Sequence, residues 1–460
     1  MKTLAQIAAE LEGYDPQALS ADDVLRFLAK LVVPVQQTDE VPLFNALGRV
    51  LAADVISPFD VPPHDNSAMD GYAFDGKQLG DALLQLQVVG TAFAGTAWRG
   101  AVAAGQCIQI MTGAIMPAGL DTVAPQELVT LKGDWITVAA KLIKLGDNRR
   151  HRGEDLAQGK PALLKGELFT PARLGLAASL GLKTVPCYRQ LKVAYFSTGD
   201  EILSLGEPPR EGAVYDSNRF VVFGLLTRLG CQVIDMGVVR DDPAFLEAAF
   251  IQAAAQADAI ITSGGVSVGE ADHTKAMMKK LGDVAFWRIA MRPGRPMAVG
   301  RIAKTAAKPI LSDKLAASQS IILASSYENN SKSVATQATD NPNGCILFGL
   351  PGNPVAVMVT FLAFVRPALL QMMGSNPVVQ PLLKACSLEA MRKKPGRTEY
   401  QRGWVSTAAD GTLAVKTTGN QGSGVLSSMA QANGLIVLHH AQGNVAAGEA
   451  VDVLMFGGAI

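Results

Sequence analysis

The chain has 460 residues, of which 48% are hydrophobic, and a formal net charge of zero at pH 7. At roughly 150 residues per domain, this length predicts about three or four domains, each with enough apolar residues for its own core. The neutral charge balance argues against a nucleic acid or an anionic membrane surface as the partner, and it leaves small ligands open.

The cysteines and the apolar runs indicate the compartment. The five cysteines are scattered and never form a C-x-x-C pair, which argues against a disulfide framework and against a zinc site. Glu10 interrupts the apolar N-terminal stretch, unlike the continuous apolar segment of a signal peptide. The best apolar run, 355–365, is about half of the roughly 20 residues that a membrane span needs. We therefore expect a cytoplasmic protein without a membrane segment.

The first part of the chain predicts one helix and one β-rich domain. Ser20 is a candidate N-cap with an acidic residue three positions later, and the apolar spacing after it predicts a helix over 20–33. The Pro-, Gly- and Asp-rich segment 60–76 predicts a domain boundary near residue 58. Short β-type runs between about 80 and 145 predict a small β-rich domain, which ends near the arginine cluster at 149–152.

Strand and helix patterns then alternate between 191 and 374, which is typical of βαβ units and a parallel sheet. The predicted strands cover 191–196, 231–236 and 258–262, and the predicted helices cover 217–229, 243–256 and 273–281. The segment 303–344 is rich in small and polar residues and predicts a surface insertion. From 376 onward, short strands without long helices predict a final small β-barrel or sandwich.

Three glycine-rich loops follow buried-strand patterns, at 196–201, 262–269 and 350–354. In a parallel sheet, their backbone N–H groups would gather at the carboxyl edge of the strands, where anionic ligands bind. Each loop alone could serve only tight packing. Carboxylates follow closely, and they are Asp200, Glu201, Glu270 and Asp272. Backbone amides beside hard oxygen ligands suit a phosphate with its Mg²⁺.

The arginines and histidines narrow the ligand class. Arg292 and Arg295 lie in an R-P-G-R-P segment that two prolines stiffen, which suits the capture of phosphate or another tetrahedral oxyanion. The alternative for each arginine cluster is a solvated basic face. Asp242 could simply cap the helix at 243–256. The five histidines show no H-E-x-x-H spacing, so the carboxylates favour Mg²⁺ over a softer metal.

Six motifs occur in a characteristic order. They are D-N-S-A-M-D-G-Y-A at 65–73, M-T-G-A at 111–114, R-G-E-D at 152–155, S-T-G-D-E at 197–201, S-G-G-V-S-V-G-E-A-D at 263–272 and L-P-G-N-P at 350–354. Together they resemble the molybdopterin molybdenumtransferases, a family that includes bacterial MoeA proteins and the E domain of gephyrin. The resemblance extends from about residue 20 to the C-terminus.

The resemblance implies an α/β multidomain protein with four domains. These are a mixed α/β linker domain (1–58 plus 153–188), a small β-rich domain (59–152), a central α/β molybdopterin-binding domain (189–374, with the insertion 303–344) and a C-terminal β-barrel-like domain (375–460). It also implies a homodimer in which the β-rich domain of one subunit completes the ligand cleft of the other. A transient contact with a molybdopterin adenylyltransferase is a further implied partner interaction.

The implied reaction takes adenylylated molybdopterin and molybdate, cleaves the pyrophosphate linkage with Mg²⁺ and releases AMP. By resemblance, Glu201, Asp241 and Asp272 hold the metal and act in catalysis together with Asp70 and Asp155. The implied substrate-binding residues are Thr112, Arg150, Gly264, Gly265, Ser267, Arg288, Arg292, Arg295, Pro351, Gly352, Arg402 and Ser423. Among these, Arg292, Arg295 and Ser423 would hold molybdate.

The chain departs from the family pattern in the insertion 303–344, which has no counterpart there, and at individual residues. Arg288, Arg292 and Arg295 stand where lysines are common, and Ala356 stands where a serine commonly follows the L-P-G-N-P-V turn. The alanine removes one hydroxyl donor and bears on the choice between molybdate and tungstate.

Two other functions fit parts of the pattern. A molybdopterin adenylyltransferase shares the glycine-loop domain, but it resembles only 189–374 and typically has T-G-G-T-G where this chain has Thr262–Val266. A non-catalytic dimeric scaffold is the other alternative, because the gephyrin E domain also clusters receptor tails.

Overall fold

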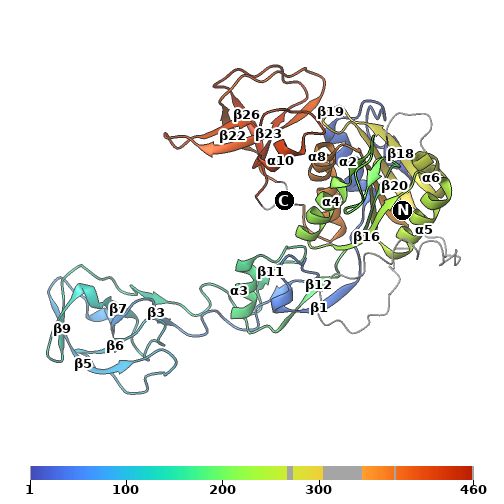
Figure 1. The fold of residues 1–460 in the computed structure, drawn as a ribbon. Helices are drawn as coiled ribbons and strands as arrows, with labels where there is room; N and C mark the ends of the chain where they lie inside the picture. Colours follow the sequence, from blue (N-terminus) through green and yellow to red (C-terminus); the bar gives the residue numbers. More distant parts are fainter. Residues whose placement is uncertain (1, 267–272, 304–343, 378–379, 458–460) are drawn as a thin grey trace. The chain divides into compact units, whose positions relative to one another are not determined.

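The computed structural model describes residues 2–266, 273–303, 344–377 and 380–457 (Figure 1). The chain forms two compact units, which are described separately below. Unit 1 comprises Met1–Asp39, Gly48–Ala52 and Pro186–Ile460, and unit 2 comprises Glu40–Leu47 and Ala53–Val185. Two of the points where the chain changes unit lie within β1 (Thr38–Pro42) and within β12 (Thr184–Tyr188). These two strands pair with each other.

A six-stranded sheet forms the centre of unit 1, in the order β16-β13-β17-β21-β20-β18. The strands are β13 (Lys192–Thr198), β16 (Gln232–Val239), β17 (Ala259–Ser263), β18 (Gly282–Arg288), β20 (Pro296–Ile302) and β21 (Cys345–Leu350). Each predicted strand and helix between 191 and 281 has its counterpart in the structure. β17 is buried at every position, as expected for a strand covered on both faces.

The predicted strands are parallel, but one further strand of the sheet runs the other way. β16, β13, β17 and β21 are parallel, but β20 runs antiparallel to both of its neighbours. Only a short segment containing β19 (Met291–Arg292) connects β18 to β20. A short connection favours an antiparallel pair, because parallel neighbours need a crossover of a dozen or more residues.

Helices cover both faces of this sheet (Figure 1). α5 (Pro243–Gln256) and α6 (His273–Leu281) pack together on one face over a core that includes Phe196 and Phe250. α4 (Ser217–Arg228) packs with α8 (Pro354–Thr360) on the other face. Asp242 caps α5 by accepting from the amides of Ala244 and Phe245, so its expected structural role is confirmed.

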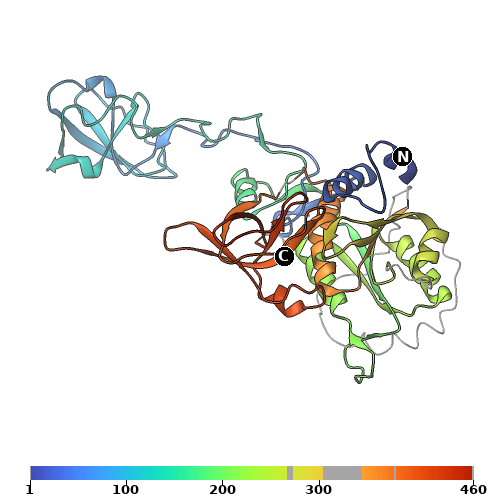
Figure 2. The same ribbon diagram turned by 90° about the horizontal axis from the view of Figure 1, so that it is seen from above.

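The N-terminal segment of unit 1 contributes two short helices, α1 (Leu4–Ala9) and α2 (Ala21–Leu31). Ser20 and Asp23 form the predicted capping box of α2. α2 packs against α9 (Arg366–Met372), and Figure 2 shows the dark-blue helix beside the orange one. The N-terminal helices therefore belong to the core of unit 1.

One helical segment of unit 1 extends across three consecutive elements. α8, a π-helical turn η4 (Phe361–Val365) and α9 run on without a break from Pro354 to Met372, over 19 residues with a mean hydropathy of 1.8. By length and composition alone, this helix could cross a membrane, although it includes Arg366 near its C-terminal end. Within the structure, 72% of it is buried, as in the core helix of a globular protein.

The C-terminal part of unit 1 is a closed β-barrel, which confirms the predicted barrel-like architecture. Its strands are β22 (Leu383–Ser387), β23 (Thr398–Thr407), β24 (Leu413–Thr417), β25 (Gly434–Leu438) and β26 (Ala450–Met455). They follow the order β23-β24-β22-β26-β25, and an additional pairing of β23 with β25 closes the ring. α10 (Leu426–Ala430) lies between β24 and β25 in sequence. β19 also pairs with β23, which joins the barrel to the segment between β18 and β20.

Unit 2 contains a second six-stranded sheet, in the order β7-β4-β6-β5-β9-β8. Its strands are β4 (Gly71–Phe74), β5 (Leu84–Ala92), β6 (Gln106–Ile110), β7 (Thr122–Pro125), β8 (Val129–Lys132) and β9 (Trp135–Val138). Separate apolar clusters pack around Phe74 and Ile108. The smaller elements of the chain are β2 (Val55–Ile56), β3 (Asn66–Ser67), β10 (Arg149–Arg150), β11 (Pro161–Leu163), β14 (Ile202–Leu203), β15 (Val214–Tyr215), η1 (Leu43–Asn45), η2 (Gly76–Gln78) and η3 (Gln126–Leu128).

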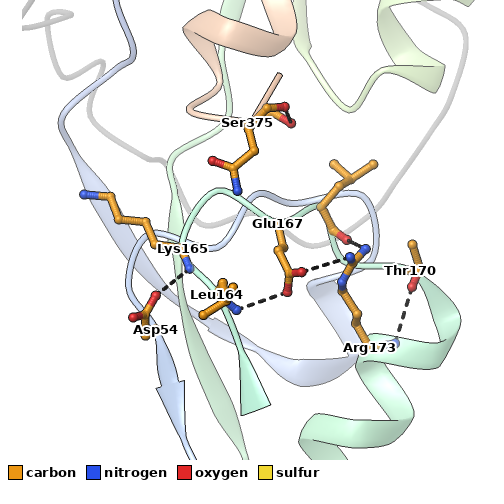
Figure 3. Close-up of polar contacts among 9 residues, drawn as sticks. Asp54, Leu164, Lys165, Glu167, Thr170, Arg173 and Ser375 are labelled. Atoms are coloured by element: carbon orange, nitrogen blue, oxygen red, sulfur yellow. Dashed lines mark hydrogen bonds and ion pairs between the residues drawn. The ribbon is translucent and has the colours of Figure 1, made fainter. Parts of the chain in front are cut away.

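A polar turn sets the start of the one long helix in unit 2, α3 (Pro171–Ser179) (Figure 3). The Thr170 hydroxyl accepts from the amide of Arg173 as the N-cap. The Glu167 carboxylate accepts from the Leu164 amide at 3.0 Å and from the Arg173 guanidinium at 3.1 Å. These bonds join the loop to the first turn of the helix.

Candidate active site

The three glycine-rich loops begin at the same edge of the central sheet, as predicted. β13, β17 and β21 are adjacent and parallel, with Ser197 opposite Ser263 and Ser263 opposite Leu350. From β13 the chain passes first to β16 on one side and then to β17 on the other, so the strand order reverses between β13 and β17. Ligands of α/β proteins bind at such a reversal, beyond the carboxyl ends of the strands.

A cleft of about 1090 Å³ opens at this edge and is wholly within unit 1. Nine of the predicted site residues line it, and these are Glu201, Asp241, Gly264, Gly265, Arg292, Arg295, Pro351, Gly352 and Ser423. Residues from the α/β sheet and from the C-terminal barrel therefore share one cavity. Two other predicted residues, Ser267 and Asp272, lie outside the described residues.

Gly264 shows why the loop after β17 needs glycine. Its φ is +89°, and a Cβ at this position would lie 2.5 Å from the carbonyl oxygen of Thr198. Its amide already donates to the carbonyl of Leu350 at 3.2 Å. Gly264 therefore lets the carboxyl ends of β13 and β17 lie close together. Its own N–H is bonded within the protein and does not face an anion.

The beginning of α8 has fewer available donors than the sequence suggested. Pro354 has no N–H, and the amide of Val355 donates to the carbonyl of Ser423 at 3.1 Å. The Asn353 side chain also donates to the hydroxyl of Ser423 at 3.0 Å. These contacts join the L-P-G-N-P turn to the barrel loop that carries Ser423.

Two exposed arginines supply positive charge to the cleft. Arg292 lies in β19, opposite Glu399 in β23, and Arg295 follows at the start of the connection into β20. Between them, Gly294 has a φ of +92°, and a Cβ there would lie 2.5 Å from the Thr360 hydroxyl. Arg288, at the end of β18, is exposed and does not line the cleft.

Two carboxylates line the same cavity. Glu201 is exposed, whereas Asp241 is partly buried and accepts from the hydroxyl of Thr274 at 3.4 Å. Within the described ranges, no three His, Cys, Asp or Glu side chains are grouped closely enough to hold a metal ion. The two carboxylates offer the hard oxygen ligands that Mg²⁺ prefers, and so the donor chemistry fits that ion.

Arg402 lies beneath the cleft and does not line it. The residue is 1% exposed, and its guanidinium donates to the carbonyls of Asn420 at 2.9 Å, Gln421 at 3.2 Å and Gly422 at 3.0 Å. Burial, and then the nearby charge of Arg292, lower the pKa of Arg402 to about 10. Arg402 thus holds the loop from which Ser423 reaches the cavity.

The remaining predicted residues lie in unit 2. Asp70, Thr112, Arg150 and Asp155 are all exposed. The Asp70 carboxylate accepts from the amide of Thr112 at 2.6 Å and from its hydroxyl at 2.7 Å, and these two hydrogen bonds lower the pKa of Asp70. Their role at the cleft of a second subunit stays a prediction.

Among the residues that line the cleft, sequence reasoning missed Asn218 and Arg397. Asn218, in the first turn of α4, donates to the carbonyl of Gly352 at 2.7 Å. Arg397 precedes β23 and forms an ion pair with the buried Glu399. No local sequence pattern marks Arg397, because only the pairing of β23 with β19 brings it to the cavity.

Comparison with known proteins identifies the family. Three family models match in chain order: the MoeA N-terminal region (domain I and II) at 19–181, a probable molybdopterin binding domain at 194–371 and the MoeA C-terminal region (domain IV) at 384–456. A molybdopterin molybdenumtransferase of Haemophilus influenzae is 40% identical over 94% of this chain and 96% of its own length. The chain belongs to the molybdopterin molybdenumtransferase family.

Other members and solved structures agree with this assignment. A molybdopterin molybdenumtransferase of Nostoc is 32% identical over 96% of this chain and 95% of its own length. Gephyrin of Dictyostelium discoideum is 28% identical over 92% of this chain but only 60% of its own length. The molybdopterin biosynthesis moeA protein of Pyrococcus horikoshii OT3 has a TM-score of 0.72 at 25% identity, covering 95% of this chain and 100% of that protein.

The matches outside the central domain bear on the alternatives. Molybdenumtransferase relatives align with almost the whole chain, and the N- and C-terminal MoeA regions flank the glycine-loop domain. A molybdopterin adenylyltransferase was expected to resemble 189–374 only. The predicted family is therefore confirmed, and the adenylyltransferase alternative is disfavoured.

Proposed function

We propose that this protein inserts molybdenum during molybdenum cofactor biosynthesis, using adenylylated molybdopterin and molybdate and releasing AMP. One observation carries the proposal: in a member of this family, a single cleft at the strand-order reversal combines three arginines with two carboxylates. Oxyanions and an oxygen-ligated cation are what such a cavity binds.

We assign the metal to the acidic side of the cleft. Glu201 and Asp241 would hold Mg²⁺, with Asp272 as the third predicted ligand outside the described residues. When bound, the ion would neutralise charge on the phosphoryl oxygens of the pyrophosphate link. The contribution of the chain itself is to place carboxylates where the strand ends gather.

We assign molybdate to the basic side. Arg292 and Arg295 carry permanent charges on a segment held by β19 and by Gly294, and Ser423 adds a hydroxyl from the barrel loop. Planar guanidinium groups suit tetrahedral oxyanions, because they donate two parallel hydrogen bonds. Arg402 supports this side by fixing the loop of Ser423.

We further propose a cytoplasmic homodimer, in which Asp70, Thr112, Arg150 and Asp155 of one subunit serve the cleft of the other. A transient contact with a molybdopterin adenylyltransferase would deliver the adenylylated pterin. Mixing inactive Asp70→Asn and Asp241→Asn homodimers under exchange tests the shared site: random exchange would restore about one quarter of wild-type activity. No recovery in verified heterodimers would place both residues in one subunit's site.

The decisive experiment is a turnover assay with purified protein, adenylylated molybdopterin, Mg²⁺ and molybdate, following AMP. We expect AMP release that requires all three additions and is lost in Asp241→Asn. Incubation with ATP and molybdopterin is the second arm, and formation of the adenylylated product there would favour the adenylyltransferase. Binding of the pterin without any turnover would favour a scaffold.

A further inference from the structure

A fully buried threonine contacts one of the two carboxylates of the cleft, and the assignments above give it no role. Thr274 is in the first turn of α6 and is 0% exposed, and it lines the cavity together with Asp241. Its hydroxyl donates to Asp241 Oδ1 at 3.4 Å. Because a hydroxyl has a single proton, this contact commits the only donor of the side chain to the carboxylate.

The contact engages one oxygen of Asp241 and leaves the other. Within the described part of the chain, Asp241 Oδ2 makes no hydrogen bond and no ion pair. The two oxygens of a carboxylate have separate lone pairs, so Oδ2 can bind a cation while Oδ1 is held by the hydroxyl. Carboxylates that bind metal ions are commonly oriented by such a hydrogen bond.

Thr274 also packs directly against the glycine-rich loop that follows β17. Gly265 has a φ of +65°, and a Cβ there would lie 2.5 Å from the Cβ of Thr274 and 2.7 Å from its hydroxyl oxygen. Gly265 lines the cleft as well. One buried side chain therefore contacts both the loop after β17 and the carboxylate after β16.

A backbone contact holds the same carboxylate segment from a second direction. The amide of Asp241 donates to Asp200 Oδ1 at 3.4 Å, and Asp200 precedes Glu201 in the chain. This bond joins the segments that follow the neighbouring parallel strands β13 and β16. Both 3.4 Å contacts are longer than the usual distance of about 3 Å, so we expect a moderate effect when either is lost.

We propose that Thr274 is a positioning residue for the divalent cation, because its hydroxyl orients the Asp241 carboxylate for metal binding. This inference rests on the proposed function and deepens it at the acidic side of the cleft. Loss of the hydroxyl should weaken metal binding and raise the Mg²⁺ concentration that half-maximal AMP release requires. The rate at saturating Mg²⁺ should change little, since every proposed metal ligand is kept.

Substitutions of Thr274 separate the hydroxyl from the methyl group. Thr274→Val keeps the shape that packs against Gly265 and loses the donor, whereas Thr274→Ser keeps the donor and loses a buried methyl group. Thr262→Val is the matched control. Thr262 lies in β17, is also 0% exposed and does not line the cleft, and among the described residues its hydroxyl has no hydrogen-bond partner.

Three measurements are made on each variant of the full chain. Titration with Mn²⁺, a hard cation that also prefers oxygen ligands, is followed by electron paramagnetic resonance, and competition with Mg²⁺ gives the affinity for that ion. AMP release against Mg²⁺ concentration gives the activation constant. Thermal unfolding by circular dichroism gives the Tm and checks that each variant is folded.

Thr274→Val should raise the Kd for both ions and the activation constant by about 10-fold, the lower end of the range for hydrogen-bond partners of metal ligands. Its Tm should stay near that of the wild type. Thr274→Ser should bind metal as the wild type does but unfold at a lower temperature, because it leaves a small cavity. A purely structural role predicts instead that metal affinity falls in the same order as the Tm. Thr262→Val should match the wild type in metal binding.

A second pair of variants covers the case in which Thr274→Val does not fold. Thr274→Ser and Thr274→Ala differ only in the hydroxyl, so the alanine variant should show the loss of metal affinity and the serine variant should not. Equal metal affinities in this pair would overturn the proposal.

Wild-type values of metal affinity and activation constant in folded Thr274→Val would also overturn the role of Thr274, as would an equal loss in Thr262→Val. These results leave wild-type AMP release in place, and so the proposed function stands. If the wild type binds no Mn²⁺ and releases AMP without Mg²⁺, the metal role of Glu201 and Asp241 fails first and the role of Thr274 falls with it.

Discussion

Substitution of Gly264 by alanine tests how tightly the strand ends must approach at the cleft. The residue follows β17 with a φ of +89°, which is costly for any side chain bearing a Cβ. The added methyl group would also lie 2.5 Å from the carbonyl oxygen of Thr198, a backbone atom at the end of β13. The loop must then move, because backbone cannot rotate away as a flexible side chain can.

Gly411 provides a matched control, because it separates the two effects. Its φ is +85°, nearly the same, but a Cβ there meets nothing within 4 Å. Gly411 lies in the turn between β23 and β24 and does not line the cleft. Gly411→Ala should therefore cost only the backbone strain, about 1 to 2 kcal/mol, and leave AMP release unchanged.

Gly264→Ala should cost more than this control by about 1 to 3 kcal/mol, the usual range for forcing extra atoms into a packed site. The displaced loop should also lower AMP release strongly, because Gly264 and Gly265 line the cavity. Urea unfolding measures the stabilities, and the turnover assay measures the activity. Equal stability losses in the two variants, with turnover retained in Gly264→Ala, would refute the argument from close approach.

Four further predictions follow from individual contacts. Asp258 is fully buried and accepts from both terminal nitrogens of Arg189 at 2.7 Å. Asp258→Asn should therefore lower the free energy of unfolding by about 3 to 5 kcal/mol. A loss below about 1 kcal/mol in urea unfolding would contradict this. The amide and the hydroxyl of Thr112 both lower the pKa of Asp70 in the folded protein. The ionised Asp70 therefore stabilises the fold fully above the unfolded pKa of about 4, and this stabilisation disappears as the pH falls through the folded pKa. In Thr112→Val, NMR titration should show a higher Asp70 pKa, and an unchanged value would exclude the hydroxyl as a cause. Ala356 lines the cleft, and Ala356→Ser should lower the Kd for molybdate severalfold by adding a donor, whereas an unchanged Kd would place the oxyanion elsewhere. Removing Mg²⁺ with a chelator should abolish AMP release and adding it back should restore the reaction, and turnover in metal-free buffer would rule out the metal role of Glu201 and Asp241.

Local sequence patterns were sufficient for the elements that depend on near neighbours. Ser20 and Asp242 were recognisable as helix caps because a cap bonds to amides only two or three residues away. β13 and β17 were recognisable because strands buried on both faces are continuous apolar runs that end in glycine. The order of the six motifs was sufficient for the family, and the three glycine loops indicated the cleft.

Long-range pairing decided the remaining features. The reversal of β20 follows from its register against both β18 and β21, which no local pattern contains. Arg397 reaches the cleft because β23 pairs with β19, more than a hundred positions earlier in the chain. The same pairing network buries Arg402 beneath the loop of Ser423 and engages the Gly264 amide with Leu350.

The residue types thus indicated which chemistry the chain could support. Only the tertiary structure decided whether each hydrogen-bond donor faces the cleft or is bonded within the protein. The physical reason is that a hydrogen-bond donor has no preferred partner until the fold brings one within about 3 Å. Arginines 292, 397 and 402 look alike in the sequence. In the fold, Arg402 is buried, whereas Arg292 and Arg397 line the cleft.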